Sequence, residues 1–195
     1  MSGNSIIVDP STGFSATVNS RNQLDVAATS EPQEVVEALN GGAFLITTGS
    51  VNLTSANLSM LLYFQNSESV SWVLNESSAV FGATDGTGDT EAQFTVNPTT
   101  GTLISAGSNL VPINLNLGSS KALTGTFKLG AEGSTVTNGG VAAPTLIPEG
   151  MLSRIFPGNP IIIAPGSSLA IGIKPPTGTT SMNVQIYVPI HRELV

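Results

Sequence analysis

The sequence predicts an almost all-β protein, a β-sandwich of jelly-roll type with one short helix and an extended N-terminal arm. Three observations support this prediction. Short segments in which apolar and polar residues alternate recur along the chain, turn sequences rich in Gly, Pro and Asn separate them, and only one stretch carries helix signals. Many short strands without alternating helices are typical of sandwiches and barrels, and their number favours a jelly roll.

The N-terminal part differs in composition from the rest of the chain. Residues 1–22 mix Ser, Asn, Gly and Pro around two extended segments, 6–8 and 14–18. We expect 1–22 to form an arm and 23–195 to form one jelly-roll domain, which begins with a strand at 23–28. The helix follows, with Ser30 as N-cap, Pro32 in the first turn and Gln33 in the capping-box position, and it ends before Gly41.

The body is predicted to consist of strands joined by turns. Candidate strands are 44–48, 51–54, 59–65, 70–82, 93–97, 102–105, 111–116, 123–129, 160–164, 168–174 and 182–189. Residues 131–150 are rich in Gly, Thr and Ala without clear periodicity, so we expect a long surface loop there.

Charge is the unusual feature of the composition. Asp, Glu, Lys and Arg together make up 10% of the residues, whereas about 25% is typical of soluble domains. The net charge is −7, and the six basic residues are scattered singly. Nucleic acids and anionic membranes are bound by clustered Lys and Arg, so we expect neither partner. A surface this poor in charge suits a subunit held inside an assembly.

Targeting and membrane signals are not evident. The first ten residues lack the basic and apolar regions of a signal peptide, and the longest apolar runs, 58–64 and 161–164, fall short of the ~20 residues that span a bilayer.

The residue types that carry out catalysis are sparse. The chain has no Cys, which excludes disulfides and thiolate chemistry. His191 is the only histidine, and no G-x-S-x-G motif accompanies it, so we expect an exposed or interface histidine rather than a hydrolase triad. Trp72 alternates with Val70 and Leu74 on one strand face, which favours a core or interface role over ligand binding.

Acidic residues offer two further alternatives. Asp85, Asp89 and Glu91 lie in the sequence DGTGDTE, a Gly-rich acidic loop of the kind that can bind calcium, although the spacing misses the EF-hand pattern. A solvated acidic hairpin is the default interpretation, and we expect no cofactor. A glycosidase pair assembled from these residues, Glu132 or Glu149 stays open, although aromatic residues for gripping sugars are few.

Four stretches of the chain resemble a known family. They are VNLTSANLSMLLYFQN from Val51, NPTTGTLIS from Asn97, NLGSSKALTGTFKLGAEGSTVTNGG from Asn116 and PGSSLAIGIKPPTGTTSMNVQIYV from Pro165. In this order they are similar to capsid cement or decoration proteins of tailed bacteriophages, over roughly two-thirds of the length. The resemblance implies a jelly-roll β-sandwich, self-association and attachment to a capsid or tail-associated surface.

The resulting expectation is a non-enzymatic cement protein on the exterior of the virion capsid. It would bind across subunits of the major capsid protein and form a homo-oligomer, with a trimer expected at three-fold positions. The alternative is a head-fibre or tail-associated host-binding module whose loops at 83–92 and 131–150 touch host glycans. A glycan hydrolase is the third hypothesis.

Overall fold

The computed structural model describes residues 5–8, 15–18, 24–25, 33–74, 78–81, 84–147, 153–154 and 160–193. The chain divides into two compact units, Met1–Pro32 and Gln33–Val195. The sequence analysis placed the division after residue 22.

The N-terminal unit contains a three-stranded antiparallel sheet in the order β1-β2-β3. Its strands are β1 (Ser5–Val8), β2 (Ser15–Val18) and β3 (Leu24–Asp25). The two segments expected to be extended are therefore paired with each other, Ser5 lying opposite Val18. The predicted strand at 23–28 contributes β3, which pairs with β2 within this unit rather than with the body.

The body, Gln33–Val195, is built of two antiparallel sheets, as the sequence predicted for an all-β protein. The first has six strands in the order β10-β12-β6-β16-β9-β13. Their bounds are Ser108–Asn109 (β10), Gly125–Leu129 (β12), Ser59–Asn66 (β6), Ser168–Lys174 (β16), Thr90–Val96 (β9) and Gly140–Ile147 (β13).

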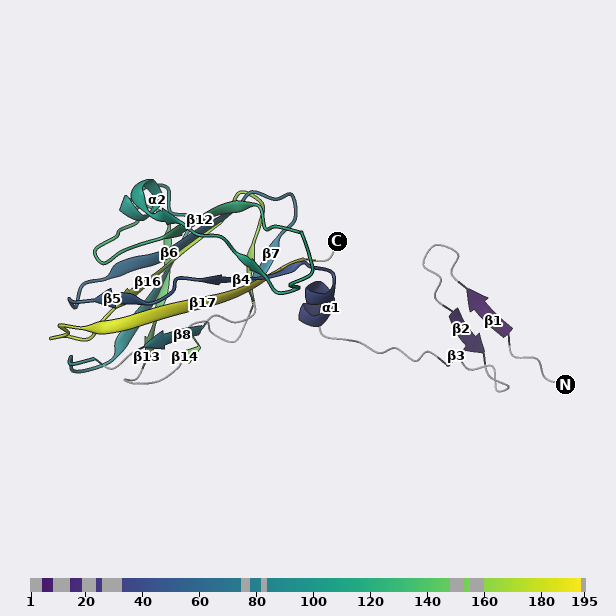
Figure 1. The fold of residues 1–195 in the computed structure, drawn as a ribbon, viewed down its shortest axis with the longest axis horizontal. Coiled ribbons are helices and arrows are strands. Elements are labelled where there is room, and N and C mark those ends of the chain that lie inside the picture. The colour runs from purple at the N-terminus through teal and green to yellow at the C-terminus, as the bar shows by residue number, and fades with distance from the viewer. Residues whose placement is uncertain are drawn as a thin grey trace. The chain divides into compact units, whose positions relative to one another are not determined.

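The second sheet has eight strands and is centred on the longest one, β17 (Met182–Arg192). Its other strands are β4 (Ala43–Thr47), β5 (Val51–Leu53), β7 (Trp72–Leu74), β8 (Ser78–Phe81), β11 (Ile113–Asn114), β14 (Ser153–Arg154) and β15 (Ile161–Ile163). One flank of β17 pairs with β4 and β5, and the other pairs with β7 and β8. Figure 1 shows β17 running along most of the body.

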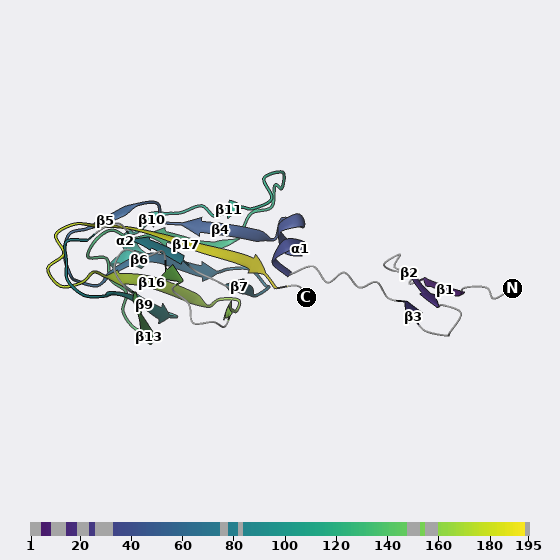
Figure 2. The ribbon, with the colours of Figure 1, turned by 90° about the horizontal axis from the view of Figure 1, so that it is seen from below.

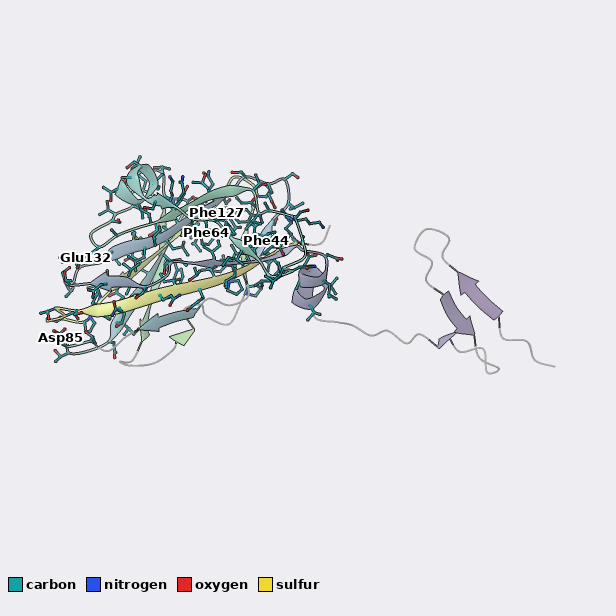
Figure 3. The ribbon with its side chains drawn as sticks, in the orientation of Figure 1. Phe44, Phe64, Asp85, Phe127 and Glu132 are labelled. Carbon is teal, nitrogen blue, oxygen red and sulfur yellow. The ribbon has the colours of Figure 1, made fainter. Side chains whose placement is uncertain are left out.

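The core lies between the two sheets, which Figure 2 shows as layers with β4 and β17 over β16 and β9. The rings of Phe44, Phe64 and Phe127 come from three strands and are buried together (Figure 3). Trp72 is fully buried and stacks on Phe127, with ring centroids 5.6 Å apart. The core role predicted for Trp72 is thus confirmed, and each buried side chain of this size contributes about 2 kcal/mol through the area it removes from water.

In the described part of the chain two short helices accompany the sheets, where one was expected. The helix α1 (Gln33–Leu39) lies where it was predicted, and its proposed N-cap, Ser30, falls outside the described residues. The helix α2 (Thr102–Ala106) replaces the strand predicted at 102–105, so that prediction was wrong. Its residue Leu103 is fully buried on the outer face of the six-stranded sheet, against Met60 and Tyr63. None of the described helices is long and apolar enough to cross a membrane.

The segment expected to be a long loop, 131–150, contains the edge strand β13. Its pairing with β9 shifts register between Ala142 and Thr145, on either side of an Ala-Pro sequence. A bulge at this point interrupts the alternation by which a strand is recognised. Pro144 is tolerated because an edge strand needs ladder hydrogen bonds on one side only. The predicted strand 70–82 is found as β7 and β8, and residues 75–77 between them are outside the described residues.

Candidate interaction surface

The segment 111–117, with sequence VPINLNL, presents its apolar side to solvent. Val111 is 85% exposed, Ile113 49%, Leu115 46% and Leu117 90%. In a strand that covers a core, the apolar positions of such an alternating sequence face inward. Of the strand predicted at 111–116, the structure forms only β11, Ile113–Asn114, and the alternating apolar residues of the segment face solvent instead of a core.

Two asparagines fix this reversed orientation. The side-chain amide of Asn114 donates to the backbone carbonyls of Gly41, at 3.0 Å, and Lys121, at 2.9 Å. The amide of Asn116 donates to the carbonyl of Leu39 at 2.9 Å. Shifting the strand by one residue would break these three bonds and would turn the asparagines outward. The exposed apolar face is therefore a defined feature of the fold.

The helix α1 extends the same surface. Val35 is 44% exposed and Leu39 is 68% exposed, and together with Ala38 they line a shallow groove whose other wall is 115–117. The groove has a volume of about 460 Å³. We define the α1–β11 patch as Val35, Ala38, Leu39, Val111, Ile113, Leu115 and Leu117.

The α1–β11 patch carries little charge. Among the side chains that the structure describes, none that lines the groove is charged, and the nearby Lys121 ammonium donates to the carbonyl of Asn40 at 2.8 Å. A surface of this kind can be covered by a partner without stripping water from ions, which is the costly step in burying polar surface. Large contiguous exposed apolar patches on a folded protein mark sites of contact with other proteins, with membranes or with ligands.

The proposed metal candidates are not brought together. Asp85 accepts hydrogen bonds from the hydroxyl of Thr180 and from the backbone N–H groups of Thr180, at 2.8 Å, and Ser181, at 3.3 Å. These bonds, that of the Thr180 hydroxyl above all, lower the pKa of Asp85 to about 2. Glu91 instead pairs with Lys174, at 3.3 Å. Across the described residues, no group of three or more His, Asp or Glu side chains is placed to hold a metal ion.

Glu132, like Asp85, accepts hydrogen bonds from a threonine hydroxyl and a backbone N–H. The two residues lie at the same end of the body (Figure 3). Its carboxylate accepts from the hydroxyl of Thr54, at 2.7 Å, and from the Thr54 N–H, at 2.8 Å, and these bonds lower the pKa of Glu132. Asn52 donates to the Ser181 hydroxyl at 3.2 Å. Each carboxylate thus connects two loops. Asp85 links the loop 84–87 to residues 180–181, and Glu132 links the loop 131–134 to Thr54. Glu149, the remaining glycosidase candidate, lies outside the described residues.

His191 is buried in β17, 5% exposed, whereas an exposed or interface histidine was expected, so an exposed position was wrong. The neighbouring Arg192 belongs to a charged cluster that the sequence analysis missed. Its guanidinium donates to Glu68 through Nε, at 2.8 Å, and Nη2, at 2.5 Å, and the indole of Trp72 and the Thr124 N–H donate to the same carboxylate. Glu68 and Arg192 are 124 residues apart, and no local pattern indicates that they meet.

The environment of Glu68 indicates that this cluster stabilises the fold. We call the ion pair of Glu68 and Arg192 the Glu68–Arg192 tie. Burial by itself would raise the pKa of Glu68, but the hydrogen bonds from Arg192, Thr124 and Trp72 and the charge of Arg192 outweigh burial and lower it. The carboxylate is therefore held ionised and fully occupied by groups of its own chain.

Among the described residues, the α1–β11 patch brings several exposed apolar side chains together around one groove. Comparisons of the chain with family models, with curated proteins and with solved structures found no match.

Proposed function

We propose that this chain is a capsid cement or decoration protein of a tailed bacteriophage, which binds the major capsid protein on the exterior of the head. The observation that carries the proposal is the segment 111–117, which includes β11 and whose apolar side is held toward solvent by the hydrogen bonds of Asn114 and Asn116. Internal hydrogen bonds hold these leucines at the surface, although burying them would be more favourable. We therefore propose that the leucines contact another protein.

A jelly roll is the architecture we propose for the body. In support, one sheet contains β6-β16-β9-β13 in this order, and the other contains β4/β5, β17, β7/β8 and β14/β15 in this order. Successive strands pass between the sheets, except that β9 and β13 share one. This is the order of two interlocked Greek keys. The segment from α2 to β12 is then an insertion that adds β12 to one sheet edge and β11 to the other.

The low charge and the acidic balance support an outward position. With a net charge of −7, the chain would be repelled by packaged DNA and tolerated on the outside of a shell. Cementing depends on many copies that each bury on the order of 1,000 Å² against coat subunits. Closed homo-oligomers are the usual arrangement for such subunits, and a trimer at capsid three-fold positions is the one we propose.

The test replaces two leucines of the patch. The double variant Leu39→Ser with Leu117→Ser removes exposed apolar surface without touching the core, so its melting temperature should stay at the wild-type value. Binding to capsids that lack the protein should weaken at least about tenfold, since each leucine buried in an interface contributes about 1.5 kcal/mol or more. Ile162→Ser is the matched control, because Ile162 is 58% exposed on β15 but lies outside the patch.

Two results would count against the proposal. If the double variant binds capsids as tightly as Ile162→Ser does, the patch is not the contact surface. If particles without the protein keep their thermal stability and shape but adsorb poorly to cells, the host-binding alternative is supported instead of cementing.

A further inference from the structure

A second concave feature lies on the outer face of the six-stranded sheet, away from the core. It has a volume of about 650 Å³, within the range of about 300–1,000 Å³ typical of small-molecule sites. Its floor contains Tyr63 from β6 and Ser168 from β16, each 4% exposed. Its walls are Ile104 from α2 and the turns at 97–99 and 165–167.

The walls are held in place by hydrogen bonds of their own chain. Asn97 adopts the left-handed conformation, with φ 50°, and exchanges two bonds with Ser168: its side-chain oxygen accepts from the Ser168 N–H at 2.8 Å, and its N–H donates to the Ser168 carbonyl at 2.9 Å. On the opposite wall, the Gln65 amide donates to the Gly166 carbonyl at 3.3 Å. A pocket whose walls are fixed before binding loses little conformational entropy when a ligand enters.

The chemistry of the lining is neutral and polar. Within the described part of the chain, no charged residue lines the pocket, while hydroxyl and amide groups do, together with the apolar surface of Ile104 and two prolines. The Tyr63 hydroxyl and the Gln65 side-chain oxygen are 3.5 Å apart, at the outer limit of a hydrogen bond. A ligand hydroxyl can therefore replace that contact at small cost. Lining of this type offers no counter-ion to a carboxylate or phosphate and offers both donors and acceptors to hydroxyl groups.

We infer that this pocket binds one unit of a neutral saccharide, which hydrogen-bonds to Tyr63 and Gln65 and lays its apolar edge on Ile104. The site is separate from the α1–β11 patch and does not rest on the proposed function. It also differs from the loops 83–92 and 131–150 that the sequence analysis considered for glycans. Affinity for a single unit is expected to be weak, with a Kd of about 1 mM, because one small ligand buries little surface.

The experiment is an NMR titration of the full chain, labelled with ¹⁵N, with glucose, galactose, N-acetylglucosamine and their disaccharides, and with glucuronate as the acidic counterpart. At least one neutral sugar should give saturable shifts confined to the amides of 63–65, Asn97, Thr99 and 166–168. Gln65→Ala and Tyr63→Phe should each weaken that binding about tenfold, since each removes a hydrogen bond made to the ligand. Gln185→Ala, a glutamine on β17 in the other sheet, should bind as wild type does.

Three outcomes would overturn the inference. They are no saturable shift with any neutral sugar, tighter binding of glucuronate than of the neutral sugars, and equal binding by wild type and Gln65→Ala. The unliganded spectra show whether each variant is folded, and Tyr63→Phe keeps the buried ring, so a loss of binding is not confused with a loss of structure. None of these readouts involves capsids, so the inference can fail while the proposed function stands.

Discussion

Thr95 is a buried hydroxyl on the outer face of the six-stranded sheet, 3% exposed, between Val141 and Ala170 on the neighbouring strands. Its oxygen has no hydrogen-bond partner among the described residues. Burying a hydroxyl without a partner costs about 1–3 kcal/mol. Thr95→Val keeps the shape and removes the hydroxyl, so the variant should be more stable than wild type by about 1 kcal/mol in urea unfolding.

Thr48→Val is the matched comparison. Thr48 is also buried, but its hydroxyl donates to Gly49 at 2.8 Å and accepts from the Ile186 N–H at 2.9 Å. The same substitution should therefore destabilise the protein here, by about 1–3 kcal/mol. A destabilised Thr95→Val variant would contradict the prediction, because it would mean that the Thr95 hydroxyl stabilises the folded protein.

Asp85 should make stability depend on pH in acid. Its pKa is about 2 in the folded protein and 3.8 ordinarily, so the unfolded chain binds a proton more readily. The contribution of Asp85 is fully present above pH 3.8 and is lost as the pH falls from 3.8 toward 2. Urea midpoints measured between pH 5 and pH 2 should fall less steeply for Asp85→Asn than for wild type. Asp89→Asn removes a charge from the same loop and should follow the wild-type curve.

At the scale of the element, the Glu68–Arg192 tie joins the loop after β6 to the end of β17. The Glu68 side chain is 9% exposed and that of Arg192 is 23% exposed, and Arg192 also donates to the Ala122 carbonyl and lies 5.1 Å from the Phe44 ring centre. Removing one partner leaves the other charge poorly solvated. Arg192→Met should therefore destabilise the protein by about 2–3 kcal/mol in chemical denaturation.

The pair Glu91–Lys174 provides the control for that prediction. Lys174 is 50% exposed and Glu91 is 24% exposed, and an exposed pair contributes between about 0 and 1 kcal/mol. Lys174→Met should thus change the free energy of unfolding by less than about 1 kcal/mol. Equal losses for the two variants would contradict a special role for the tie.

The elements predicted correctly are those in which the alternation of apolar and polar residues and the flanking turn residues agree with the observed structure. The strand 168–174 was predicted with the bounds observed for β16, because turn residues delimit it on both sides. The prediction of a strand at 102–105 was wrong. The sequence TLISA contains residues that favour strands, but in the folded protein it forms α2, which buries Leu103 against Met60 and Tyr63. Such a tertiary contact overrides local propensity and leaves no trace in a single sequence.

The α1–β11 patch likewise depends on tertiary contacts that a single sequence does not indicate. Alternation at 111–116 predicted a strand, but a period of two defines two faces and does not say which is buried. The hydrogen bonds of Asn114 and Asn116 to the distant carbonyls of Gly41 and Leu39 decide it. The saccharide pocket was not predictable either, because its floor and walls come from four separate segments of the chain.

At the scale of the whole molecule, the two units should be separable. The buried core of the body consists of residues from the unit Gln33–Val195. Deleting residues 1–32 should therefore leave a cooperative melt with a Tm within about 3 °C of the full chain, measured by circular dichroism. A broad, non-cooperative transition would show that the N-terminal sheet completes the body.

The position of β17 has a consequence for how the protein is made. This strand pairs with β4 and β5 on one side and with β7 and β8 on the other. Both halves of the sheet therefore lack their central partner until residues 182–192 have been synthesised. During synthesis, the earlier strands leave the ribosome with an empty central place and exposed edges of the kind that pair with other chains. Until residues 182–192 have been added, the nascent polypeptide is therefore expected to expose strand edges that are open to intermolecular pairing.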